Sequence, residues 1–184
     1  MYPAEYKKLF ELGAVDPNSE NVCCLYDMEW LPQDFNNDLG ISLAEGLFAF
    51  AQEGGGNLWL CSTKGLVYFS ELCDDISEVY ADSFSCAIFK HLLEFCYQNN
   101  FSINSPESWE MPELDAKKTI NKWLCIFESV LCIEWVSDIV EIMNQPLADH
   151  GVGYVSFISE VTYNKLISKH KLLTKNDPIK WCVD

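Results

Sequence analysis

The fold is decided by residues 47–69, which read Leu47-Phe-Ala-Phe-Ala-Gln-Glu-Gly54-Gly55-Gly56-Asn57-Leu-Trp59-Leu-Cys61, then Ser-Thr, then Lys64-Gly65-Leu-Val-Tyr68-Phe69. Two short apolar segments flank three glycines, and consecutive glycines can adopt the positive φ angles that a tight turn requires. The pattern therefore predicts a β-hairpin, and a second hairpin follows at Lys64-Gly65. Strands are expected near residues 47–51, 57–62 and 66–69, paired as an antiparallel sheet.

Helices are predicted before and after these strands in the sequence. Residues 4–12 form a short first helix, with Pro3 near its first turn and Gly13 just past its end. Ala81-Asp82-Ser83-Phe84 leads into a second helix, whose apolar residues recur at helical spacing as far as Phe95. Either Asp82 or Ser83 can cap it. Residues 22–26 predict a further strand, and residues 31–40 predict a polar connection.

The rest of the chain predicts a mostly helical extension. Residues 99–112 contain the turn-forming residues expected of a linker or an extended wrap. A long helix is expected over residues 115–132, another around 138–143, a strand over 153–158, and a last helix that Ser159 caps and that runs to about residue 171. The expected fold class is α+β: a twisted, mainly antiparallel sheet flanked by helices. Residues 1–98 form a module, and the extension, residues 99–184, packs on the same core as part of one domain.

The order of these parts resembles the SUKH superfamily over residues 2–98. Phe48-Ala-Phe50-Ala51 ahead of the glycines is similar to the family's strand and glycine turn, and Gly65-Leu-Val-Tyr68 is similar to its next strand. Ala81-Asp-Ser83-Phe84 resembles the family's start to an apolar helix, and residues 2–10 resemble its N-terminal helix. Asn57 and Ala49 stand where the family usually has Asp and Pro, so the chain is identified as a divergent member. The residues that carry the predicted structural motif are Gly54, Gly55, Gly56, Asn57, Trp59, Gly65, Tyr68, Ser83 and Phe84.

This superfamily includes bacterial immunity proteins that neutralise secreted toxins and homologues of a yeast regulator of cell-wall synthesis. The resemblance implies a cytoplasmic immunity-type protein that binds a cognate polymorphic toxin domain and is not an enzyme. The alternative from the same family is a regulatory or scaffolding domain, which genomic context without a toxin gene would favour. A third hypothesis is an enzyme that uses Asp149-His150 in a loop.

Charge narrows the kind of partner. The chain has a net charge of −16, and all twelve basic residues are lysines. Arginine supplies the bidentate fork that recognises phosphates and base edges, so its absence and the acidic surplus argue against nucleic-acid binding. Residues 1–112 hold 18 acidic residues and four lysines, so the excess lies mainly in the family-like part. A basic partner, such as a nuclease toxin, fits this charge.

Two acidic sets are candidates for partner contact, although a solvated surface remains the alternative reading of both. The first set follows the third strand: Glu71, Asp74, Asp75, Glu78 and Asp82. The second precedes the hairpin: Asp27, Glu29, Asp34 and Asp38. Clustered carboxylates raise the association rate of a basic partner and can mimic phosphate charges. Trp30 and Trp109 are candidate aromatic anchors, with a place in the core as the alternative.

Other kinds of site find little support. The nine cysteines are odd in number and contain no Cys-x-x-Cys pair, which favours reduced thiols in a cytoplasmic protein. No His or Cys pair has zinc-ligand spacing, and the glycines precede a strand rather than the helix that a phosphate loop requires. We therefore expect no metal and no cofactor. The N-terminus lacks a secretory signal pattern, and no apolar run reaches the roughly 20 residues of a membrane span. The oligomeric state is left open.

Overall fold

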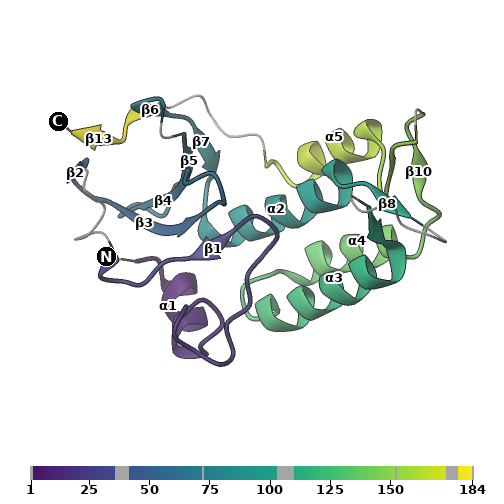
Figure 1. Ribbon diagram of the computed structural model, residues 1–184, viewed down its shortest axis with the longest axis horizontal. Coiled ribbons are helices and arrows are strands. Elements are labelled where there is room, and N and C mark those ends of the chain that lie inside the picture. Colours follow the sequence, from purple (N-terminus) through teal and green to yellow (C-terminus); the bar gives the residue numbers. More distant parts are fainter. Residues whose placement is uncertain are drawn as a thin grey trace. The chain divides into compact units, whose positions relative to one another are not determined.

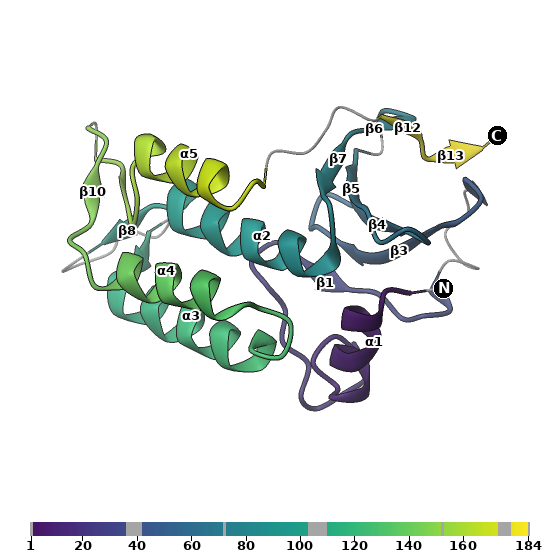
Figure 2. The same ribbon diagram turned by 180° about the vertical axis from the view of Figure 1, so that it is seen from behind.

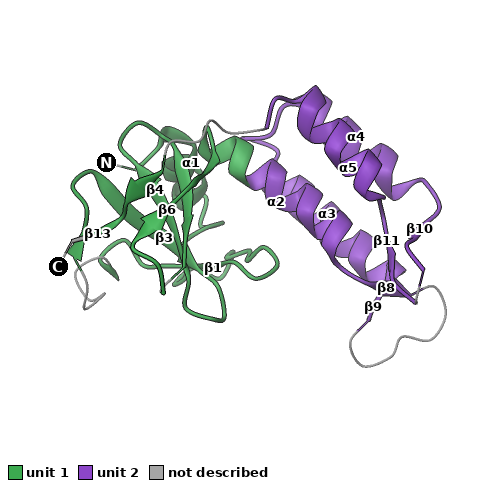
Figure 3. Cartoon of the chain, turned by 90° about the horizontal axis from the view of Figure 1, so that it is seen from above, with its two compact units in different colours: residues 1–87, 173–184 green, residues 88–172 purple. Residues whose placement is uncertain are grey.

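The computed structural model describes residues 2–35, 42–71, 73–102, 110–151, 153–172 and 178–183. Within these ranges the fold is α+β, with a mainly antiparallel five-stranded sheet and a helical C-terminal region, which confirms the predicted class (Figure 1). The chain divides into two compact units, residues 1–87 with 173–184 and residues 88–172 (Figure 3). The division at residue 98, and the packing of the extension on a shared core, stay predictions.

The first unit is built on the sheet predicted from residues 47–69. Its strands are β1 (Glu29–Trp30), β3 (Leu47–Gln52), β4 (Leu58–Ser62), β5 (Val67–Ser70) and β7 (Val79–Ala81). They are hydrogen-bonded in the order β1-β3-β4-β5-β7, and every neighbouring pair is antiparallel. Strands β3 to β5 therefore confirm the two predicted hairpins.

Two glycines make the turns of these hairpins. Between β3 and β4, Gly56 has a φ of +87° and donates its N–H to the carbonyl of Glu53 at 2.8 Å. The Asn57 side-chain amide donates to the Glu53 carboxylate, which fastens the same turn. Between β4 and β5, Gly65 has a φ of +88°. Of the three consecutive glycines only Gly56 adopts a positive φ, so the turn requires one glycine rather than three.

One apolar cluster of the first unit consists of aromatic rings. Helix α1 (Ala4–Glu11) contributes Tyr6, whose ring centroid lies 5.5 Å from that of Phe84. Phe84 is the first residue of α2 (Phe84–Gln98) and lies 5.3 Å from Phe50 of β3. The Ser83 hydroxyl accepts the N–H of Cys86 at 3.1 Å, so Ser83 caps α2. The predicted motif thus positions both the sheet and the start of the helix.

A second apolar cluster combines buried residues of β3, β4, β5 and β7 with a residue of the C-terminal segment. Its buried members are Leu31, Ala49, Leu58, Leu60, Tyr68, Val79 and Trp181. Trp181 lies between two short strands, β12 (Ile179–Lys180) and β13 (Cys182–Val183). Strand β12 pairs with β6 (Ile76–Ser77), beside which it lies in Figure 2, and β13 pairs with β2 (Ser42–Leu43). The C-terminal segment therefore connects β6 to β2.

The second unit contains most of α2 together with α3 (Glu113–Phe127), α4 (Ile133–Met143) and α5 (Glu160–Lys169). Aromatic pairs hold these helices together: Phe95 of α2 lies 4.8 Å from Trp123 of α3, and Phe89 stacks on Trp135 of α4 at 4.8 Å. Ser159 accepts the N–H of Thr162 at 3.3 Å, which confirms it as the cap of α5. Short strands complete the unit: β8 (Phe101–Ser102) with β9 (Met111–Pro112), and β10 (Ala148–Asp149) with β11 (Val155–Ser156).

Four predicted elements differ from the structure. Residues 22–26 form no strand beyond an isolated bridge between Leu25 and Met28, because Cys23 N–H donates to the Ala14 carbonyl in an irregular loop. The helix expected to reach residue 132 ends at Phe127, whose carbonyl accepts from Val130 and Leu131 in a turn, and α4 starts five residues earlier than expected. The strand expected over residues 153–158 is confined to β11.

Candidate functional site

The first acidic set lies on a loop that the C-terminal segment holds in place. The Asp74 carbonyl accepts the indole N–H of Trp181 at 2.7 Å, and the Asp75 carbonyl accepts the backbone N–H of Trp181 at 3.0 Å. The Asp74 carboxylate accepts the N–H of Ile76 at 3.0 Å, and the buried hydroxyls of Ser70 and Ser77 lie 2.5 Å apart. Backbone and side-chain hydrogen bonds therefore fix the conformation of residues 74–77.

The carboxylates of the loop point into solvent. Every member of the first acidic set is exposed: Glu71, Asp74, Asp75, Glu78 and Asp82. Among the residues that the structure describes, the lysine within ion-pair distance of this set is Lys180, whose ammonium lies 3.3 Å from the Asp75 carboxylate. Both side chains of that pair are about half exposed, at 51% and 52%, so solvent screens it strongly. The loop is a fixed surface that carries a net negative charge.

The second acidic set lies elsewhere. Glu29 is on β1, at one edge of the five-stranded sheet, whereas Glu78 and Asp82 flank β7 at the other edge. Asp27, with a φ of +50°, and Asp34 are exposed near Glu29, and Asp38 lies outside the described residues. Nothing in the sequence separates the two acidic sets in space. The strand order shows that Glu29 of the second set and Glu78 and Asp82 of the first set lie at opposite edges of the sheet.

Trp30 is a core residue and not a surface anchor. Its side chain is 4% exposed, its indole N–H donates to the Cys23 carbonyl at 2.8 Å, and its ring stacks on Phe50. The sequence around Trp30 is polar because β1 is only two residues long and the neighbouring side chains of Asp27 and Glu29 are exposed. Of the two open readings, the place in the core is therefore the observed one. Trp109 falls outside the described part of the chain.

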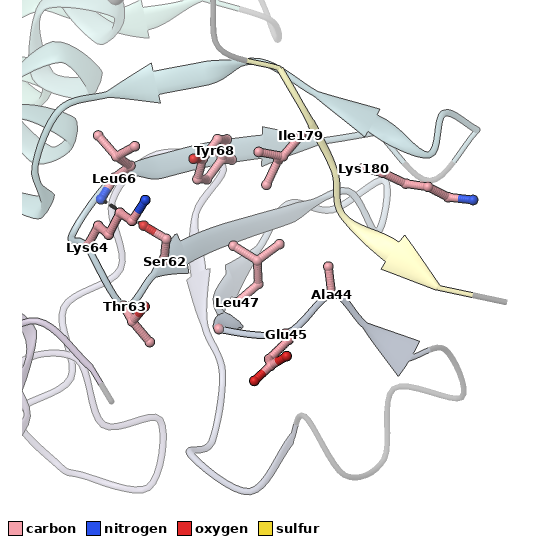
Figure 4. A pocket seen from close by; sticks show the side chains of 11 residues that line it. Ala44, Glu45, Leu47, Ser62, Thr63, Lys64, Leu66, Tyr68, Ile179 and Lys180 are labelled. Atoms are coloured by element: carbon pink, nitrogen blue, oxygen red, sulfur yellow. Dashed lines mark hydrogen bonds between the residues drawn. The ribbon is translucent and has the colours of Figure 1, made fainter.

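A cavity of about 270 Å³ opens beside the C-terminal segment (Figure 4). Apolar side chains from three places in the sequence form its walls: Leu47 of β3, Leu66 and Tyr68 of the second hairpin, and Ile179 of β12. Figure 4 shows Ala44 and Leu47 directed toward the side on which Tyr68 and Ile179 lie, whereas Glu45, Thr63 and Lys180 are directed outward at the rim. The Ser62 hydroxyl accepts the N–H of Leu66 at 3.1 Å, which holds the hairpin wall in place.

Sequence reasoning missed this cavity and the segment that closes it. Residues 178–183 show no helical or strand periodicity, and their pairing joins positions about 100 residues apart for β6 and about 140 apart for β2. The one signal was Trp181 itself, a large apolar residue close to the end of an acidic chain. Such residues are rarely left in solvent.

The Asp149-His150 loop does not have the arrangement of a catalytic pair. The Asp149 carboxylate accepts the N–H of Gly151 at 2.7 Å, and this hydrogen bond closes a turn. His150 Nε2 lies 2.7 Å from the Ser156 hydroxyl, which itself donates to the Ile158 carbonyl at 2.7 Å. His150 must then donate a hydrogen bond to Ser156, and a serine that accepts from the histidine instead of donating to it is not activated as a nucleophile.

Two buried cysteines and His170 are in surroundings that favour a structural role. Burial raises the pKa of the Cys61 and Cys96 thiols to about 12, which disfavours the reactive thiolate. His170 is the C-cap residue of α5, and its buried ring bonds Asp138 on α4. Within the described ranges, no group of three or more potential metal ligands was found.

Comparisons with known proteins add no family to these observations. A scan against protein-family models found no match, and searches of curated proteins and of solved structures found none either. None of the helices in the described ranges combines the length and the apolar character that crossing a bilayer requires.

Proposed function

We propose that this chain is an immunity-type binding protein of the SUKH kind, which neutralises a basic toxin domain by direct contact in the cytoplasm. The observation that carries this proposal is the acidic loop of residues 71–82. Five carboxylates lie exposed on a backbone that is fixed in advance by Trp181 and by the pairing of β6 with β12. A charged surface that needs no ordering on binding gives fast association with a partner of opposite charge.

A binding role also agrees with the chemistry of the other candidate sites. The His150–Ser156 pair is arranged for structure, and the most buried thiols are held protonated. The absence of arginine disfavours a nucleic-acid ligand. Replacing His150 with Ala tests the enzyme alternative, because unchanged neutralisation by that variant removes it.

Co-expression with the C-terminal domain of a toxin encoded beside this gene tests the proposal. We expect rescue of growth, and a complex that co-purifies at low salt and weakens as the salt concentration rises, because screening shortens the reach of charge attraction. An assay that gave neither a complex nor rescue would refute the immunity role. A complex insensitive to salt would move the contact from the acidic loop to an apolar surface.

A further inference from the structure

From the cavity beside the C-terminal segment we infer that the protein partner inserts one uncharged apolar side chain between Leu47, Leu66 and Ile179 while its basic residues contact the acidic loop. This inference rests on the proposed function and adds the place and chemistry of the anchor. The cavity holds about 270 Å³, slightly below the range of about 300–1,000 Å³ typical of small-molecule sites. Its size and open rim suit one protein side chain.

The walls explain why the anchor is apolar. Leu47, Leu66 and Ile179 are only partly buried, although they pack against the cluster that contains Tyr68 and Trp181. Their exposed carbon atoms face a cavity, so filling it removes apolar surface from water at about 25 cal/mol per Å². Anchors in such pockets, ringed by polar residues, contribute most of the binding energy of many protein interfaces.

The charges explain why the anchor is uncharged and why the partner is basic around it. At the rim, two lysines, Lys64 and Lys180, are matched by Glu45 and by Asp75, the ion-pair partner of Lys180. The cavity itself is therefore close to neutral. Strand β12, which lines the cavity, pairs with β6 of the acidic loop. That loop adds the exposed carboxylates of Glu71, Asp74 and Glu78. Charge complementarity thus selects a cationic surface around an apolar centre.

The inference is tested with a random 12-residue peptide library displayed on phage and selected against the full chain. We expect the enriched peptides to share one large apolar residue flanked by Lys or Arg. Replacing that residue with Ser, or introducing Ala44→Phe in the protein to fill the cavity, should each weaken binding at least tenfold. The matched control is Ala4→Phe, because Ala4 is exposed on α1 and does not line the cavity.

Ala44→Val and Ala44→Leu extend the series with smaller side chains, so a folding defect of the Phe variant leaves a graded loss of affinity to measure. The inference is overturned if no peptide is enriched, or if the selected peptides bind the Ala44 variants as tightly as the parent. The immunity role is judged separately by toxin neutralisation. If the Ala44 variants still neutralise the toxin, the cavity is not the toxin-binding site but the immunity role stands. If peptides bind in the cavity but the protein does not neutralise the toxin, the cavity is a binding site but the immunity role is wrong.

Discussion

The indole N–H of Trp181 donates to the backbone carbonyl of Asp74 at 2.7 Å, across 107 positions of sequence. The same tryptophan is 2% exposed and belongs to the cluster beneath β3, β4 and β5. One residue therefore completes a core and fixes the loop that carries the acidic set, and it follows Ile179 and Lys180, which line the cavity. Stability and partner binding are expected to be coupled through it.

Trp181→Ala should lower the free energy of unfolding of the first unit by about 3–5 kcal/mol, because it removes a buried indole and leaves a cavity. Urea unfolding followed by circular dichroism measures the change. Trp181→Phe keeps most of the apolar contact and loses one hydrogen bond, so it should cost about 1–3 kcal/mol. A loss below about 1 kcal/mol for the Ala variant would mean that the C-terminal segment is not part of the core in solution.

Reversing two charges of the acidic loop, Glu71→Lys with Glu78→Lys, should slow association with a basic toxin domain by about tenfold at low salt. The control pair is Glu11→Lys with Glu20→Lys, which changes the net charge by the same amount, from −16 to −12, at exposed positions outside the loop. Stopped-flow fluorescence measures both rates. Equal effects of the two pairs would assign the attraction to net charge and not to this loop.

Ser83→Ala should destabilise the protein by about 1 kcal/mol, because the hydroxyl that accepts the N–H of Cys86 is lost from the start of α2. Ser83→Asp should restore most of that stability, since a carboxylate accepts the same bond and interacts favourably with the helix dipole. Ser85→Ala, inside the same helix, is the matched control and should be neutral or slightly stabilising. Thermal melts rank the three variants, and a loss at Ser85 equal to that at Ser83 would argue against the cap.

Local chemistry accounts for what could be predicted from the sequence. Gly56, Gly65, Ser83 and Ser159 act on residues within four positions, so the hairpins and helix starts were visible in the sequence. The end of α3 was missed because no glycine or proline marks it and the apolar spacing continues through the turn after Phe127. A helix that ends without such a residue depends on its packing in the folded state.

The candidate site was predicted in part. The exposure of the five acidic residues followed from their charge, but the binding of that loop by Trp181 depends on contacts between distant positions. The burial of Trp30 could not be predicted either. Its indole donates to the Cys23 carbonyl, which lies in an irregular loop that was predicted as a strand. The cavity requires both hairpins and the C-terminal segment, and no single stretch of sequence encodes it.

Asp138 provides a pH-dependent test of the second unit. Burial tends to raise the pKa of this carboxyl, but hydrogen bonds and charge interactions with Lys169 and His170 outweigh it and lower the pKa below its usual value. Lys169 Nζ lies 2.7 and 2.6 Å from the two carboxylate oxygens, and the His170 ring bonds one of them. These bonds join α4 to the end of α5.

A carboxyl with a lower pKa in the folded state stabilises the protein above its unfolded pKa of about 3.9, and the stabilisation is lost as the pH falls through the folded value. Asp138→Asn should therefore lower the free energy of unfolding by about 1–2 kcal/mol at pH 6, because bonds to a charged acceptor become bonds to a neutral one. The difference from the parent should shrink steadily from pH 5 to pH 3. Urea titrations across that range measure it, with Asp115→Asn, at an exposed ion pair with Lys118, as the control. A difference that stays constant with pH would show that the charge of Asp138 does not stabilise the contact between α4 and α5.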